Sequence, residues 1–105
     1  MEIDLLYVPE CPNRSLARAR VDDALASTGL VALIREREIR TSEEAARRGM
    51  RGSPTILIDG QDRFGGTTES PALACRLYHN EAGSTGAPTV EQLIEVLGRW
   101  HEERS

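Results

Sequence analysis

The sequence predicts one α/β domain spanning residues 1–105, in which helices flank a mixed β-sheet in the order β-α-β-α-β-β-α. A length of 105 residues suits one hydrophobic core, because two cores would leave each half too short to bury enough surface. Short apolar runs alternate with segments of helical period, which is typical of a layered α/β fold. Asp59-Gly60 follows one such run and favours a tight turn that joins paired strands.

The first half of the chain predicts a strand, a helix and a second strand. The first strand, Glu2–Val8, is a mostly apolar run closed by Pro9. A helix with apolar residues on one side runs from Pro12 to about Gly29, a residue type that commonly ends helices. Leu30–Arg40 begins apolar and continues with alternating charges, as expected of a strand with one end in solvent. A right-handed crossover makes these two strands parallel neighbours.

Two capping boxes and a turn organise the second half. In Thr41–Glu44 and again in Thr89–Gln92, a threonine and an acid or amide three residues on can satisfy backbone amides at a helix start. A strand at Pro54–Ile58 leads through the Asp-Gly turn to a return strand, Gln61–Phe64. The connection from 65 to 87 is long enough to be functional or to contain a short helix of its own.

Charge and apolar content exclude several classes of partner. Seventeen acidic and thirteen basic residues give a net charge of −4 with no basic block, so no nucleic-acid partner is expected. No run reaches the ~20 apolar residues of a membrane-spanning helix, and the start is acidic where a secretory signal is basic. We therefore expect a cytoplasmic protein that binds no membrane. The two cysteines and two histidines lack zinc-site spacing, so neither a metal nor a cofactor is expected.

Cys11 is the strongest candidate for a reactive group. It lies between the first strand and the first helix, and Pro12 is favoured at the first helical position, which places Cys11 at the N-cap. Helix-start amides and the cation Arg14 would favour the thiolate, which is the nucleophilic form. The alternative is a small apolar residue packed between strand and helix.

Three segments carry a resemblance to a known superfamily. Leu5–Pro12 resembles the strand, loop and Cys-Pro start of thioredoxin-like and glutaredoxin-like proteins, and Gly52–Gly60 is similar to their cis-proline segment. The resemblance implies a thioredoxin-like fold, a cis bond before Pro54, and a backbone beside it that pairs with a thiol substrate. Phe64–Glu69 is similar to the double-glycine turn that holds the γ-glutamyl end of glutathione in glutaredoxins. The chain also resembles small bacterial proteins with a Cys-Pro-Asn start, some of them labelled alkylmercury lyase-like.

The chain departs from the dithiol members of that superfamily. Where they have Cys-x-x-Cys, this chain has Cys11-Pro12-Asn13-Arg14, which excludes dithiol reduction through that motif. Cys75, far along the chain, is then either a distant resolving thiol or a small buried residue in a short helix.

The expected function is therefore thiol–disulfide exchange by a monothiol or two-cysteine redox protein. Its substrate would be a thiol or disulfide, either glutathione or a protein thiol. Cys11 and Cys75 are the candidate catalytic residues. The candidate substrate-binding residues are Pro12, Arg14, Ser53, Pro54 and Thr55.

Two alternatives stay open beside thiol–disulfide exchange. In the first, Cys11 and Cys75 bind or cleave an organomercurial, because thiolates bind soft metals, and Glu10 or Asp59 donates a proton. In the second, the fold serves as a binding module that docks a partner at the Pro54 edge without chemistry.

Other charged residues carry weaker signals. Arg47, Arg48 and Arg51 form a small basic group that either attracts an anionic thiol or is a solvated face. His79 and His101 are expected in a loop and near the chain end, and each is a candidate base only if it lies within hydrogen-bond reach of its target.

Overall fold

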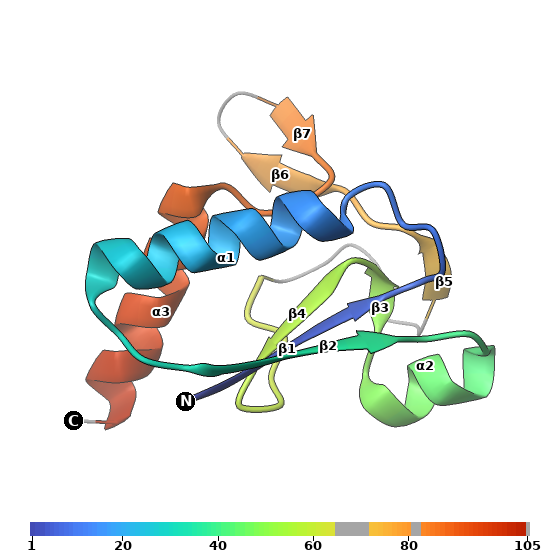
Figure 1. The fold of residues 1–105 in the computed structure, drawn as a ribbon, viewed down its shortest axis with the longest axis horizontal. Helices are drawn as coiled ribbons and strands as arrows, with labels where there is room; N and C mark the ends of the chain where they lie inside the picture. The colour runs from blue at the N-terminus through green and yellow to red at the C-terminus, as the bar shows by residue number, and fades with distance from the viewer. Residues whose placement is uncertain (65–71, 81–82, 105) are drawn as a thin grey trace.

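A three-stranded sheet lies between helices in the computed structural model of this chain (Figure 1). The structure describes residues 1–64, 72–80 and 83–104, without the side chains of residues 72–75 and 84. In chain order the elements are β1 (Glu2–Tyr7), α1 (Arg14–Thr28), β2 (Leu33–Glu38), α2 (Ser42–Arg48), β3 (Arg51–Ser53), β4 (Thr55–Ile58), β5 (Ala72–Cys75), β6 (Tyr78–Asn80), β7 (Gly83–Thr85) and α3 (Val90–Arg104).

β1 is the central strand of the sheet, whose strand order is β2-β1-β4. β1 runs parallel to β2 and antiparallel to β4, and Leu5 lies opposite Glu36 on one side and Ile56 on the other. The parallel pair confirms the expected crossover, and the sheet is mixed as predicted. β3 pairs with β5 and β6 pairs with β7 in separate two-stranded units.

Alternate residues of β1 and β4 pack on opposite faces of the sheet, as the pleat of a strand requires. α1 and α3 cover one face, and their buried residues meet Ile3 and Leu5 of the sheet. α2 covers the other face, where Ala45 packs with Leu6 and Leu57. Figure 1 shows α2 on the opposite side of the sheet from the α1–α3 pair.

Local signals in the sequence determine most helix ends. Thr41 Oγ1 accepts from Glu44 N at 3.1 Å to begin α2. The box at Thr89 is reciprocal, because Thr89 Oγ1 accepts from Gln92 N and Gln92 Oε1 accepts from Thr89 N, at 3.1 and 2.9 Å. Gly29 closes α1 at φ 73°, the left-handed region where glycine avoids a steric penalty.

The expected return strand is wrong. The turn forms, since Ile58 and Gln61 exchange backbone hydrogen bonds at 2.9 and 3.1 Å, but Gln61 makes only an isolated bridge. The side chain of Asp62 instead binds Arg76, at 2.6 Å from Asp62 Oδ2 to Arg76 Nη1. Asp62 therefore bonds to the residue that follows β5, and the described residues after Gln61 do not pair further with β4.

The described part of the 65–87 connection forms strands and not a short helix. Residues 72–75, 78–80 and 83–85 are strands β5, β6 and β7. Cys75 thus lies at the end of β5, which pairs with β3. Among the described residues, no helix is long and apolar enough to cross a membrane.

Candidate functional site

Cys11 lies in a loop of two consecutive turns between β1 and α1. Its backbone N–H donates to Val8 O at 3.2 Å, and its own carbonyl accepts from Arg14 N at 3.4 Å. Glu10, in the first turn, has a φ of 60°, a backbone region that residues other than glycine and asparagine seldom adopt. The Cys11 side chain is half-buried. The loop therefore holds a partly accessible thiol at the end of the central strand.

The helix after Cys11 begins two residues later than predicted. Asn13, and not Cys11, is the N-cap of α1, so Cys11 precedes the helix start. The physical reason is the second turn, in which Arg14 N bonds to the Cys11 carbonyl before helical bonding begins with Ala17 N and Asn13 O at 2.9 Å. Pro12 is exposed in this turn.

Arg14 is held by other groups near the Cys11 loop. Its Nε lies 3.1 Å from Glu36 Oε1, and its guanidinium group stacks 4.1 Å from the centre of the Tyr7 ring. The hydrogen bond to Glu36 raises the pKa of Arg14 above its usual value. Its charge is thus shared with Glu36, which weakens the electrostatic help that the sequence led us to expect for a Cys11 thiolate.

Ser53 joins the Cys11 loop to the strand that ends at Cys75. Its buried hydroxyl accepts from Val8 N at 3.0 Å, and Val8 O in turn accepts from Cys11 N. On its backbone side, Ser53 is the register partner of Cys75 in the β3–β5 pair. Ser53 O also accepts from Arg76 N at 3.0 Å. The two cysteine-bearing segments are therefore both bonded to one buried residue.

The turn at Pro54 is built as its motif predicts. The Ser53-Pro54 peptide bond is cis, and the following strand β4 runs antiparallel to β1. Thr55 is fully buried, and its hydroxyl donates to Gly52 O at 2.6 Å and accepts from Arg51 N at 3.1 Å. The side chains of Ser53 and Thr55 are thus occupied in fixing the turn. Pro54 is also fully buried, so none of these three predicted substrate-binding side chains is open to a substrate.

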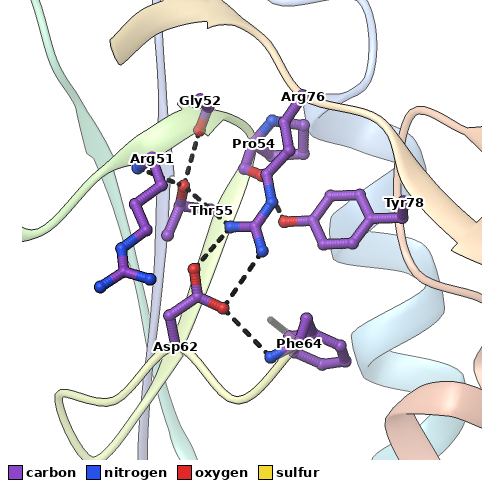
Figure 2. Close-up of polar contacts among 8 residues, drawn as sticks. All are labelled: Arg51, Gly52, Pro54, Thr55, Asp62, Phe64, Arg76 and Tyr78. Atoms are coloured by element: carbon purple, nitrogen blue, oxygen red, sulfur yellow. Dashed lines mark hydrogen bonds and ion pairs between the residues drawn. The ribbon is translucent and has the colours of Figure 1, made fainter. Parts of the chain in front are cut away.

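A buried polar cluster supports the far side of this turn (Figure 2). Arg76 and Asp62 form an ion pair with two contacts of 2.6 and 3.3 Å, and their side chains are only 5% and 6% exposed. Arg76 also lies 4.5 Å from the centre of the Tyr78 ring, over its face. The Tyr78 hydroxyl donates to Pro54 O at 2.5 Å. Burial raises the pKa of Tyr78 above its usual value, so this hydroxyl stays a donor.

No local pattern in the sequence predicts this cluster. Asp62 lies after a turn, Arg76 in an irregular connection, and Tyr78 in a segment without clear periodicity, so their proximity depends on tertiary folding alone. The one available hint is that Arg76 and Tyr78 lie within three residues after Cys75. Together they fix the segment that carries Cys75 against the Pro54 turn.

Several weaker candidates lie apart from the Cys11 loop or outside the described residues. Asp59 accepts from Glu2 N at 2.8 Å, at the start of β1, whereas Cys11 follows the end of that strand. The double-glycine motif Phe64–Glu69 lies outside the described residues from position 65 on. His79 is exposed on β6, where its carbonyl accepts from Gln92 Nε2 at 2.6 Å, and His101 is exposed on α3.

The described residues contain no group of three or more His, Cys, Asp or Glu side chains that could hold a metal ion. Their arrangement at the Cys11 loop offers one partly accessible thiol, a buried serine and a second cysteine segment. Comparisons with protein-family models, with curated proteins and with solved structures found no match for this chain.

Proposed function

We propose that this chain is a thioredoxin-like protein that exchanges thiols and disulfides, with Cys11 as the attacking thiolate and Cys75 as the resolving thiol. The observation that carries the proposal is that Ser53 contacts both cysteine-bearing segments. Its hydroxyl bonds to the loop of Cys11, and its backbone pairs with Cys75. A disulfide needs Cα atoms no more than ~7 Å apart, so both segments must be held near one point.

The chemistry needs two exchange steps. The Cys11 thiolate attacks one sulfur of a disulfide, forms a mixed disulfide with it, and releases the other sulfur as a thiolate. The Cys75 thiolate then attacks Cys11 Sγ and releases the second substrate thiolate. The substrate is reduced to two thiols, the chain is oxidised to a Cys11–Cys75 disulfide, and an external dithiol must reduce it for another cycle.

The position of β5 favours an internal resolving thiol. In the thioredoxin-like proteins that the sequence resembles, the backbone beside the cis-proline pairs with the substrate. Here Ser53 O already accepts from Arg76 N, the residue after Cys75. The chain's own cysteine segment occupies that side of the turn, and the Arg76–Asp62 pair anchors it there. Cys75 can therefore take the place that a second substrate thiol would need.

Mapping of the disulfides tests the proposal. We expect mild oxidation of the native protein to join Cys11 to Cys75 within one chain, and glutathione to form only a transient adduct at Cys11. In Cys75→Ser the same adduct should accumulate, because no thiol resolves it. The measurement is mass spectrometry of tryptic peptides, combined with the rate at which the protein reduces a small disulfide.

A matched control moves the thiol without changing the number of cysteines. Cys11→Ser/Ser15→Cys transfers it from the loop to an exposed position in α1, and this variant should form no internal disulfide. Native protein whose Cys11 forms only a stable glutathione adduct would contradict the role of Cys75. A Cys11 that resists modification altogether would overturn the redox function and favour a docking module.

A further inference from the structure

The face of the sheet that carries α2 has a hollow of about 410 Å³ whose walls are rich in arginine. Its floor is formed by Asp4, Leu6 and Leu57, neighbouring residues on β1 and β4. The walls are formed by Arg35 and Arg37 of β2 and by Arg47 and Arg48 of α2. None of these residues belongs to the Cys11 site, so the hollow needs an explanation of its own.

The alternation of β2 sorts its charges between the two faces of the sheet. Arg35 and Arg37 lie beside Asp4 and Leu6 in the parallel register, on the α2 face. Glu36, between them, points to the other face and binds Arg14 and Arg18 of α1 at 3.1 and 3.0 Å. The run of alternating charges is therefore not a uniformly solvated edge, because Arg35 and Arg37 lie on one face of the sheet and Glu36 on the other.

Asp4 holds the two strand arginines at the hollow. One of its oxygens lies 2.9 Å from Arg35 Nε and 3.5 Å from Arg37 Nε, and its side chain is only 15% exposed. Arg35 also contacts Glu2 at 3.2 Å. Both arginine side chains remain more than a third exposed, at 40% and 35%, and the guanidinium N–H groups that these contacts leave free can donate hydrogen bonds to an oxyanion.

The helix arginines have no such partners. Arg47 and Arg48 are exposed in the last turn of α2, and within the described part of the chain neither side chain forms an ion pair or hydrogen bond. The helix dipole favours cations in the last turn, which accounts for the presence of the two arginines in α2. It does not account for their position opposite Arg35 and Arg37 across the hollow.

The charge balance of the hollow differs from that of the whole chain. Four arginines and one carboxylate, that of Asp4, line the hollow, and Glu2 contacts one of these arginines. Positive charge is therefore in excess at this hollow of a chain whose net charge is −4. Guanidinium groups bind phosphate and carboxylate oxygens in pairs of parallel hydrogen bonds. The volume falls within the range of ~300–1,000 Å³ that is usual for small-molecule sites.

From these observations we propose that this hollow binds a small polyvalent oxyanion, a molecule with at least two phosphate or carboxylate groups. Its anionic groups contact Arg47 and Arg48 on one wall and the free edges of Arg35 and Arg37 on the other. Asp4 acts as a positioning residue, because one of its oxygens contacts both strand arginines and holds them at the hollow. The inference does not depend on the thiol chemistry proposed for Cys11.

Titration with two simple probes tests the site. Pyrophosphate and citrate are added separately to the reduced full chain at constant ionic strength, and binding is followed by calorimetry and by NMR of the arginine side chains. We expect at least one probe to bind at one site and to shift the signals of the hollow's arginines. Arg47→Gln/Arg48→Gln should weaken that binding by about tenfold or more, because two charge-assisted contacts are lost.

The matched control removes the same charge from another surface. Arg99→Gln/Arg104→Gln changes two exposed residues of α3, which lies on the other face of the sheet, and should leave the affinity within about twofold. Preference for pyrophosphate or for citrate assigns the anionic group of the ligand. The proposal is overturned if neither probe binds, or if both double variants weaken binding equally, which would indicate attraction to net charge alone.

Discussion

At the scale of single residues, the buried pair Arg76–Asp62 is the most consequential interaction in the described chain. Two charges that are only 5% and 6% exposed are costly to remove from water, and this cost is offset only when both partners are present. Here the pair lies beside Thr55, whose hydroxyl is 3.5 Å from Arg76 Nη1. The pair thus stabilises the Pro54 turn and the Cys75 segment together.

Removing one member of this pair should cost far more than removing both. Asp62→Asn leaves the Arg76 charge buried, and we expect the free energy of unfolding to fall by ~3–5 kcal/mol. The double variant Asp62→Leu/Arg76→Met should lose less than Asp62→Asn, because no uncompensated charge remains. Urea denaturation followed by circular dichroism measures both values.

An exposed pair of the same chemistry is the control. Arg99 and Glu95 lie 2.5 Å apart on α3 with side chains 70% and 61% exposed, so Glu95→Gln should change stability by less than ~1 kcal/mol. A loss in Asp62→Asn no larger than that in Glu95→Gln would show that burial does not strengthen the Asp62 pair.

At the scale of elements, the start of α1 packs against the loop that leads into α3. A Cβ atom added to Gly86 would lie 2.2 Å from Asn13 Nδ2 and 2.3 Å from Asn13 Cγ, closer than any real contact allows. Further along α1, Arg20 Nη1 donates to Ala87 O and Pro88 O at 3.0 and 3.2 Å. The Cys11 loop is therefore held from the α3 side as well as by Ser53.

The Gly86–Asn13 contact predicts a non-additive pair of substitutions. Gly86→Ala should destabilise the protein by ~1–3 kcal/mol, because Asn13 must move. In an Asn13→Ala background the obstructing atoms are absent, and Gly86→Ala should be neutral or stabilising by up to ~1 kcal/mol, since Gly86 does not have a positive φ. Denaturant midpoints of the four proteins of this double-mutant cycle provide the coupling energy.

Gly98→Ala is the matched control for this cycle, because a Cβ at Gly98 in α3 meets no atom within 4 Å. This substitution should stabilise the helix by up to ~1 kcal/mol. Equal effects of Gly86→Ala with and without the Asn13 side chain would contradict the contact.

Elements whose signals are local could be predicted from the sequence, and those fixed by distant contacts could not. Thr41, Thr89 and Gly29 act on backbone groups within a few residues, so the helix ends they predict are confirmed. Gln61–Phe64 failed as a strand because Asp62 binds a partner fourteen residues on, outside any local pattern. β5 likewise depends on pairing with β3, and the placement of Cys75 beside Ser53 required the structure.

At the scale of the whole molecule, two hydrophobic clusters share the same strands. Ile3 and Leu5 of β1 pack under α1 and α3. Leu6, the next residue of the strand, packs under α2. β4 divides its residues in the same way, with Leu57 on the α2 side. Both clusters contain residues of β1, so unfolding of this strand would expose the apolar residues of both. Both faces should therefore unfold in one transition.

Core substitutions on opposite faces test this cooperativity. Leu97→Ala lies in the α1–α3 cluster and Met50→Ala in the α2 cluster, and both residues are at most 1% exposed, so each should cost ~2–5 kcal/mol. Trp100, the single tryptophan, packs against the first cluster, so its fluorescence reports on that face. We expect Met50→Ala to lower the denaturation midpoints of Trp100 fluorescence and of far-ultraviolet circular dichroism by the same amount, although Met50 lies in the other cluster. A Met50→Ala protein whose fluorescence midpoint stays unchanged while its circular dichroism midpoint falls would show that the α2 face unfolds separately.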